Sequence, residues 1–353
     1  MPRPIQAHID LNALENNLHV ARHATSSRIM AVIKANGYGH GLLRVAQALA
    51  DADGFALLDI QDAIRLREAG YRQTILLLEG FFDATDLELL AEYKLTSVIH
   101  SPWQIAQLAA YPKRKKLDVW LKVNTGMNRL GFAPGDVAQA LELLLCQRAV
   151  RDLTLMTHFA HADEARGIGK PLQLFNEIAA DYRVSRSLAN SAALLRYRAT
   201  HGDWVRPGIL LYGASPFADV TAAQLGLRPA MTLTSRIIAV QDLRSGDEIG
   251  YGALFRADRT MRVGIVACGY ADGYPRHAPN GTPMLVAGQA ARLLGRVSMD
   301  MLCVDLSALP DADVGSVVTL WGEGMPIEQV AQAAGTISYE LMCALAARVK
   351  VVV

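Results

Sequence analysis

The 353-residue chain has little cysteine and no long hydrophobic run. Its four cysteines lie far apart and form no C-x-x-C pair, which favours reduced thiols over a disulfide framework. No apolar stretch approaches the length that spans a membrane. The opening residues MPRPIQAHID also lack the apolar core of a signal peptide. We therefore expect a cytoplasmic protein with no membrane partner.

The chain also lacks an excess of charge of either sign. Its 35 Lys and Arg residues and 34 Asp and Glu residues leave a formal net charge of +1, so no overall field attracts nucleic acid. The KRKK run over residues 113–116 is typical of a solvated turn, and we expect no nucleic-acid partner. We also expect no metal. His158 and His161 lie on a strand-to-loop segment, and because side chains alternate in direction along a strand, the two rings would be too far apart to bind one ion.

Short apolar runs alternate with amphipathic stretches over the first two thirds of the chain. Each run is apolar on both faces, as expected of a parallel strand that is covered on both sides. The runs cover residues 29–35, 55–59, 74–80, 97–100, 119–124, 153–159, 187–190 and 204–213. Eight strand–helix units are the number that closes a (β/α)₈ barrel. A doubly wound open sheet is the alternative, because a count alone does not prove closure.

The pattern changes near Met231. From this point the strands are short, punctuated by Gly, Pro and Asp, and only residues 326–335 and 339–349 have a helical pattern. Such a series indicates an antiparallel β domain. We predict an α/β chain with an N-terminal (β/α)₈ TIM-type barrel over residues 1–231 and a C-terminal, mainly antiparallel β domain over residues 232–353. The N-terminal strand at residues 7–11 is expected to join the β domain.

The stretch AVIKANGYGHG, residues 31–41, leads from an apolar strand through a single lysine, Lys34, into three glycines. A glycine-rich turn between a strand and a helix commonly holds a phosphate, yet neither common nucleotide fingerprint is present. In a barrel, chemistry lies at the carboxyl ends of the strands and phosphate sites form near the last two. A phosphate beside a strand-end lysine suggests pyridoxal 5'-phosphate held by Lys34. A partly solvated lysine is the alternative.

Further blocks occur in order over nearly the whole chain. They are LKVNTGMNRLG, THFAHADE, LANSAA, WVRPGILLYG, GYGALF, GYADGYPR, GRVSMDM and SYELMC. Together with the lysine stretch, these blocks resemble those of bacterial alanine racemases, which are pyridoxal-phosphate enzymes of fold type III. The resemblance implies an isomerase that interconverts L- and D-alanine as a head-to-tail homodimer with shared active sites. It also implies supply of D-alanine for peptidoglycan, or catabolism of L-alanine.

The same resemblance implies a two-base mechanism. Lys34 would hold the cofactor and act as one acid/base, and Tyr251 from the partner subunit would act on the opposite face of the substrate's Cα. Arg206 would donate to the pyridine nitrogen of the cofactor and keep it unprotonated, since arginine has no acceptor. A cofactor ring with an unprotonated pyridine nitrogen is a weaker electron sink, which disfavours transamination and decarboxylation.

The remaining site residues are also carried over from the resemblance. The cofactor-binding residues would be Lys34, Tyr38, His158, Ser191, Arg206, Gly208, Ile209 and Tyr339. The substrate-binding residues would be Arg129 and Met299, and the entrance residues would be Asp163, Tyr270, Arg276 and Arg296. Lys122 would be carbamylated, as in some members, and would then orient Arg129.

Two positions depart from the family's usual pattern. Gly37 stands where the family usually has alanine, and Asn124 stands where an acidic residue is common. Gly37 would loosen the lysine loop and alter cofactor affinity, and any role of an acidic charge at Asn124 is lost.

Two other functions remain open. A racemase of wider range, acting on serine for example, would use the same residues. A non-enzymatic pyridoxal-phosphate carrier on the same barrel is the second alternative, and the β domain that carries Tyr251 counts against it. A decarboxylase is disfavoured by Arg206.

Overall fold

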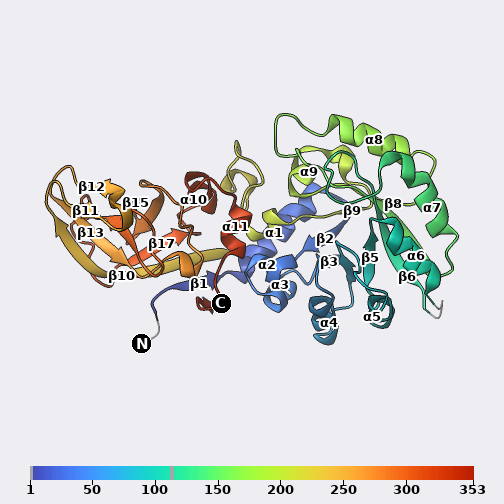
Figure 1. Cartoon of the computed structure of the whole chain (residues 1–353), viewed down its shortest axis with the longest axis horizontal. Coiled ribbons are helices and arrows are strands. Elements are labelled where there is room, and N and C mark those ends of the chain that lie inside the picture. Colours follow the sequence, from blue (N-terminus) through green and yellow to red (C-terminus); the bar gives the residue numbers. More distant parts are fainter. Residues whose placement is uncertain (1–2, 112–114) are drawn as a thin grey trace.

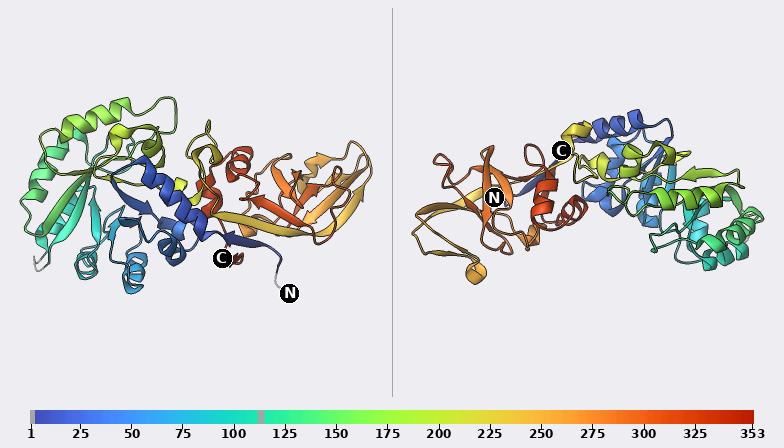
Figure 2. Two further views of the ribbon diagram at one scale, coloured as in Figure 1. Left: turned by 180° about the vertical axis from the view of Figure 1, so that it is seen from behind. Right: turned by 90° about the horizontal axis from the view of Figure 1, so that it is seen from above.

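Two lobes joined by a narrow waist make up the molecule (Figure 1, Figure 2). The computed structural model describes residues 3–111 and 115–353, so Lys113 and Arg114 of the basic run lie outside the described residues. One lobe is a closed barrel of eight strands, and the other is built on a sheet of eight strands. The predicted combination of a (β/α)₈ barrel and a mainly antiparallel β domain is therefore confirmed.

Eight parallel strands form the barrel. They are β2 (Arg28–Val32), β3 (Gly54–Leu57), β4 (Thr74–Leu77), β5 (Thr96–Ile99), β6 (Leu117–Lys122), β7 (Val150–Met156), β8 (Ser185–Ser187) and β9 (Trp204–Val205). The ring closes where Arg28 pairs with Trp204 and Ile29 pairs with Val205. This closure excludes the open sheet. The strands are almost wholly buried because side chains fill the barrel inside and helices cover it outside.

Helices surround the barrel (Figure 1). They are α1 (Leu11–Ala24), α3 (Leu42–Ala48), α4 (Ile60–Glu68), α5 (Asp86–Glu92), α6 (Pro102–Ala110), α7 (Val137–Leu145), α8 (Gly169–Ala179) and α9 (Ser191–Arg196). Polar side chains fix several of their starts: Asp10 accepts a hydrogen bond from the backbone N–H of Ala13, and Asn190 accepts one from Ala193. The segment labelled α2 (Lys34–Tyr38) has a different backbone conformation, which is described with the site.

A mainly antiparallel sheet forms the second lobe, in the order β13-β16-β15-β14-β17-β10-β1-β18. Its strands are β1 (Gln6–Ile9), β10 (Met231–Leu243), β13 (Met261–Val266), β14 (Pro283–Val286), β15 (Gln289–Leu294), β16 (Leu302–Asp305), β17 (Val317–Trp321) and β18 (Lys350–Val352). A separate pair, β11 (Glu248–Ile249) and β12 (Phe255–Arg256), lies at the far end. β1 pairs antiparallel with β10 and parallel with β18. The two ends of the chain therefore meet in one sheet.

The helices α10 (Ile327–Ala333) and α11 (Ser338–Cys343) lie between this sheet and the barrel (Figure 1). Buried apolar residues of both lobes belong to one continuous core. At the waist, a Cβ placed on Gly39 would lie 2.2 Å from the carbonyl oxygen of Met342 in α11. The second lobe therefore packs directly against the loop that follows Lys34.

Several predicted elements have different bounds in the structure, and the strand expected at residues 204–213 spans only Trp204–Val205, with a 3-10 helix over Ile209–Tyr212. The strand expected at residues 7–11 spans Gln6–Ile9, because Asp10 caps α1 and Leu11 is already helical. The helix expected at residues 339–349 is shorter and ends at Cys343. Beyond it, the N–H of Ala346 donates to the carbonyl oxygen of Asp272 at 3.2 Å, so a tertiary contact takes the place of a helical bond. No helix in residues 3–111 or 115–353 is long and apolar enough to cross a membrane.

Candidate active site

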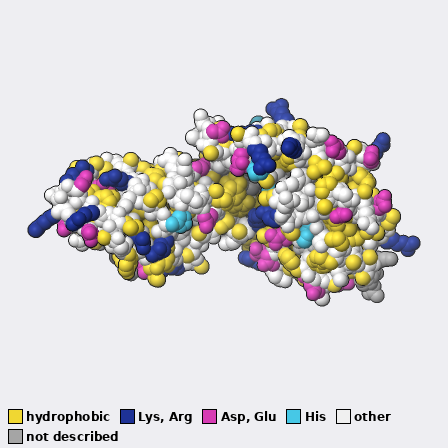
Figure 3. All heavy atoms as spheres, turned by 45° about the horizontal axis from the view of Figure 1, so that its top comes forward, with side chains coloured by type: hydrophobic (Ala, Val, Ile, Leu, Met, Phe, Trp, Pro, Cys, Tyr) yellow, Lys and Arg dark blue, Asp and Glu magenta, His cyan; other side chains and the backbone are white. Residues whose placement is uncertain are grey.

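A cleft of about 800 Å³ opens at the carboxyl ends of the barrel strands, and Tyr339 of α11 contributes to its wall. Figure 3 shows a hollow at the waist between the two lobes, with hydrophobic side chains around it. The predicted site residues that line this cleft are Lys34, Tyr38, Lys122, Arg129, His158, Asp163, Ser191, Arg206, Gly208, Ile209 and Tyr339. Residues spread over three hundred positions therefore share one cleft, because parallel strands end on the same side of a barrel.

A second group of predicted site residues does not line the cleft. These residues are Tyr251, Tyr270, Arg276, Arg296 and Met299, all in the β domain. The side chains of Tyr251 and Met299 are 70% and 53% exposed. Within one chain, the predicted site is thus divided between the barrel cleft and the surface of the second lobe.

Lys34 opens a left-handed turn. The five residues that follow it, 35–39, all have positive φ, with values of 51°, 53°, 62°, 50° and 79°. A non-glycine residue in this conformation costs roughly 1–2 kcal/mol. Asn36 holds the turn: its carbonyl accepts from Gly41 at 2.8 Å and its side chain accepts from Leu42 at 2.9 Å. The fully buried His40 adds ring contacts to the carbonyls of Tyr38 and Gly37, at 2.9 and 3.1 Å.

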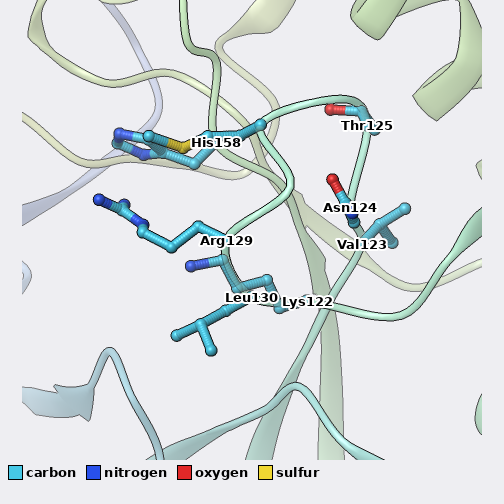
Figure 4. Close-up of a pocket in the computed structure, with 8 residues that line it drawn as sticks. Lys122, Val123, Asn124, Thr125, Arg129, Leu130 and His158 are labelled. Carbon is cyan, nitrogen blue, oxygen red and sulfur yellow. The ribbon is translucent and has the colours of Figure 1, made fainter.

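Four cationic side chains line the cleft, those of Lys34, Lys122, Arg129 and Arg206. Burial, and next the charge of Arg129, lowers the pKa of Lys34. Burial and the charges of Arg206, Arg129 and Lys34 lower the pKa of Lys122 to about 8. The side chains of Lys122 and Arg129 point to the same side of their strand end (Figure 4). So many positive groups in a partly buried space favour a bound anion, such as a phosphate or a carboxylate.

His158 lies in the same cleft and stays neutral. Burial, followed by the charges of Arg206 and Lys122, lowers its pKa to about 3. His161, by contrast, pairs with Glu164 at 3.1 Å on the surface. The two imidazoles therefore lie in different environments, His158 in the cleft and His161 on the surface. Over residues 3–111 and 115–353 no three His, Cys, Asp or Glu side chains gather as metal ligands.

Arg206 follows β9 and is held by three acceptors. Its Nη1 donates to Ser187 Oγ at 2.5 Å, and its Nη2 donates to the carbonyls of Thr157 and Leu188 at 2.5 and 3.2 Å. Burial lowers the pKa of Arg206 to about 10, which leaves the guanidinium charged at neutral pH. The group is therefore a fixed donor that presents positive charge to the cleft.

Hydroxyls and backbone N–H groups meet at the ends of the last two strands. Ser191 Oγ accepts from the N–H of Gly208 at 2.9 Å. A Cβ on Gly208 would lie 2.7 Å from the hydroxyl oxygen of Tyr38, so only glycine allows this close approach. Tyr38 stacks on Tyr212 with ring centroids 4.4 Å apart, and burial raises its pKa. The corner offers hydroxyls and backbone N–H groups, which can bind a phosphate.

Comparison with known proteins gives consistent matches. Residues 9–216 match the family model described as alanine racemase, N-terminal domain, and residues 230–353 match alanine racemase, C-terminal domain. The chain belongs to the alanine racemase family. Members of this family are isomerases.

Individual racemases match over the whole length of the chain. The alanine racemase of Nitrosospira multiformis is 62% identical, with 99% of each chain covered. The crystal structure of the biosynthetic alanine racemase of Pseudomonas aeruginosa has a TM-score of 0.97 at 46% identity, again over 99% of each chain. The alanine racemase of Bartonella henselae, described with covalently bound pyridoxal phosphate, has a TM-score of 0.90 at 27% identity over 99% of each chain.

Against the racemase pattern, the departure at Asn124 has a local structural role. Its side-chain oxygen accepts from the N–H groups of Gly126 and Asn128 at 3.1 and 3.0 Å, and its amide donates to Asn128 Oδ1 at 3.0 Å. A carboxylate could accept the first two bonds but could not donate the third. The amide thus organises the loop that leads to Arg129, and Figure 4 shows it pointing away from Lys122 and Arg129.

Several cleft residues of this racemase were missed from the sequence. Glu79 and His100 line the cleft wall, and the His100 ring contacts the Glu79 carbonyl at 3.0 Å. His40, which braces the lysine turn, was also missed. Glu79 and His100 lie near the ends of the strand runs predicted at residues 74–80 and 97–100, and His40 lies inside the glycine-rich block, so strand-end position was the available signal. Their burial is a tertiary property that this signal does not contain.

The Gly37→Ala substitution tests the lysine turn. Gly37 has a φ of +62°, and an added Cβ would lie 2.7 Å from Cγ2 of Val45. We expect a loss of about 1–2 kcal/mol from the backbone conformation, and a further loss from the contact with Val45. Urea unfolding of the variant measures the total.

A matched control separates the two causes. Gly70 also has a positive φ, +95°, but no atom lies within 4 Å of an added Cβ. Gly70→Ala should therefore show the backbone loss alone. The Gly37→Ala/Val45→Ala double variant should lose less than the sum of its single variants. Equal losses in Gly37→Ala and Gly70→Ala would show that the contact with Val45 is unimportant.

Proposed function

We propose that this chain racemises alanine with pyridoxal 5'-phosphate bound through Lys34. The observation that carries the proposal is the convergence of cations and neutral donors around a lysine whose pKa is lowered. A lowered pKa leaves more of the amine neutral, as attack on the cofactor's aldehyde requires. When bound, the cofactor supplies an electron sink that makes the Cα–H bond of an amino acid labile.

The residues of the cleft fit this cofactor. Tyr38, Ser191 and Tyr339, with the backbone N–H groups of Gly208 and Ile209, would hold the phosphate. Arg206 would donate to the pyridine nitrogen, a role supported by its three fixed hydrogen bonds and retained charge. His158 would lie against the ring as a neutral group.

Racemisation needs proton donors and acceptors on both faces of Cα. Lys34 would remove or return the proton on one face. Tyr251 is mostly exposed and does not line the cleft of its own chain, so the partner subunit's Tyr251 would act on the other face. This requirement supports a head-to-tail homodimer in which each cleft is completed by the second lobe of the other chain.

Substrate binding and entry would use charged groups of both chains. Arg129 would pair with the substrate carboxylate, with the partner subunit's Met299 opposite. Asp163, Tyr270, Arg276 and Arg296 would line the entrance, where charges of both signs suit small zwitterions. Since racemisation runs in both directions, the product could supply peptidoglycan with D-alanine or support catabolism of L-alanine.

The first test follows both the chirality and the deuterium content at Cα. The purified, cofactor-loaded protein is incubated with L-alanine in heavy water. We expect D-alanine that carries deuterium, and we expect the Tyr251→Phe variant to lose exchange from one face by about 10²–10⁴-fold. Unchanged L-alanine would favour a carrier, and faster turnover of serine would favour a racemase of wider range.

Mixed dimers test the shared site. Lys34→Ala and Tyr251→Phe chains are each expected to be nearly inactive. In a mixed dimer, one cleft combines the intact Lys34 of one chain with the intact Tyr251 of the other. Since one of its two clefts is intact, we expect each mixed dimer to have about half of the wild-type activity. If mixed dimers form and remain inactive, the two residues act within one chain.

Lys122 is proposed to carry a carbamate. A neutral amine attacks carbon dioxide, the N–C bond forms and a proton leaves to solvent, so the positive charge becomes negative. With a pKa of about 8, roughly a tenth of Lys122 is neutral at pH 7, and this fraction rises as the pH passes 8. The negative charge would offset Arg129, Arg206 and Lys34.

The carbamate predicts a labelled carbon signal in enzyme equilibrated with ¹³C-bicarbonate. We expect the signal to increase with pH at a fixed pressure of carbon dioxide, and to be absent from a Lys122→Met variant. Crystals grown near neutral pH should show density beyond the Lys122 nitrogen. Density that ends at this nitrogen would sink the proposal.

A further inference from the structure

Asp272 carries a carboxylate that is completely buried in the β domain. The carboxylate accepts from the backbone N–H of Gly269 at 3.0 Å. It also pairs with two arginines from the ends of the chain: Arg3 Nη2 lies at 3.2 Å and Arg348 Nε at 2.7 Å. A single carboxylate therefore holds its own turn, residues 269–274, to both chain ends.

A second turn, residues 298–301, is fixed by the same group. Arg348 Nη2 donates to Asp300 Oδ1 at 2.7 Å, and Arg3 Nη2 donates to the carbonyl of Asp300 at 2.8 Å. The two turns also contact each other directly. The N–H of Tyr270 donates to the carbonyl of Ser298 at 3.0 Å. The N–H of Ala271 donates to the carbonyl of Met299, also at 3.0 Å. The two turns are therefore joined into one unit by these hydrogen bonds and by the contacts of Asp272.

These turns carry Tyr270 and Met299, whose side chains are 38% and 53% exposed and lie outside the cleft of their own chain. The other end of the unit reaches the cleft. Arg348 follows α11, which carries Tyr339 in the cleft wall, and the N–H of Ala346 donates to the Asp272 carbonyl at 3.2 Å. Asp272 thus links the exposed turns to the segment that follows α11.

A buried ion pair is weak grounds for stability, because desolvation offsets much of the attraction, but it can fix one geometry. Here only the carboxylate is buried, since the Arg3 and Arg348 side chains are 40% and 39% exposed, so loss of its charge would release both guanidiniums to water and free the segments they join. The Arg292–Asp305 pair of the same lobe, with N–O distances of 3.1 and 3.0 Å, joins only the neighbouring strands β15 and β16. The Asp272 group instead joins four segments that are far apart in the sequence.

We propose that Asp272 is a positioning residue that sets the turns bearing Tyr270 and Met299 for the active site of the partner subunit. Asp272 does not touch the substrate. It acts in trans, through the two turns, on how tightly the other cleft binds alanine. This inference rests on the proposed function, because it needs a shared site.

The Asp272→Asn variant keeps an oxygen for the N–H of Gly269 and loses the charge that pairs with Arg3 and Arg348. We expect the KM for L-alanine to rise about tenfold, with kcat within about threefold, because the turns contact the bound substrate and the transition state alike. The cofactor absorbance should be retained. Asp305→Asn, which breaks the control pair, should leave both constants unchanged. An unchanged KM in Asp272→Asn would overturn the proposal.

Mixed dimers show where Asp272 acts. Pairing an Asp272→Asn chain with a Lys34→Ala chain leaves one working cleft, whose Lys34 belongs to the first chain and whose turns belong to the second. Those turns have an intact Asp272, so we expect the wild-type KM. A raised KM in this mixed dimer would mean that Asp272 acts within its own chain, against the proposal.

The result is distinguishable from failure of the shared site. If mixed dimers of Lys34→Ala and Tyr251→Phe chains form but stay inactive, the shared site of the proposed function fails and the KM data are read for a single chain. Arg348→Lys provides a second variant should Asp272→Asn not fold. Its single ammonium cannot bridge Asp272 and Asp300 as the guanidinium does, so the same rise in KM, and the same recovery in mixed dimers, are expected.

Discussion

Repulsion among like charges at the carboxyl end of the barrel is the constraint on which the rest of the site depends. The barrel brings Lys34, Lys122, Arg129 and Arg206 to one cleft, where burial first and their mutual repulsion second lower the pKa of both lysines. The consequences are amines that lose a proton more easily than a solvated lysine does, and an environment that favours anions. The proposed reaction of the Lys34 amine with an aldehyde and the proposed binding of a phosphate and a carboxylate in this cleft would have the same physical origin.

The backbone must hold these cations in place against their repulsion. The turn that follows Lys34 provides part of this support. Three of the five successive residues with positive φ, Ala35, Asn36 and Tyr38, are not glycine and are strained there, so the surroundings must fix them. Asn36 and His40 bond the turn from within, and α11 of the second lobe closes on Gly39 from outside. The position of the proposed cofactor lysine therefore depends on both lobes, although the lysine belongs to the barrel.

The second lobe contributes residues to two different surfaces. Its helix α11 completes the cleft of the same chain, whereas Tyr251, Tyr270 and Met299 lie on a surface away from that cleft. The proposed dimer gives this exposed surface a function. Asp272 links the parts of the lobe that carry these residues, since its contacts run from the segment after α11 to the exposed turns.

The sequence by itself determined the two-domain fold, the eight barrel strands and the lysine at a strand end, because strand periodicity and turn residues are local properties. Ordered blocks resembling alanine racemases also marked the residues that now share the cleft. Only the tertiary structure decided the left-handed turn, the burial of His40, the loop role of Asn124 and the early end of α11. It also divided the predicted site between a cleft and a distant surface. These features depend on groups brought together from distant parts of the chain, as Asp272 is with Arg3 and Arg348, and local patterns carry no record of such contacts.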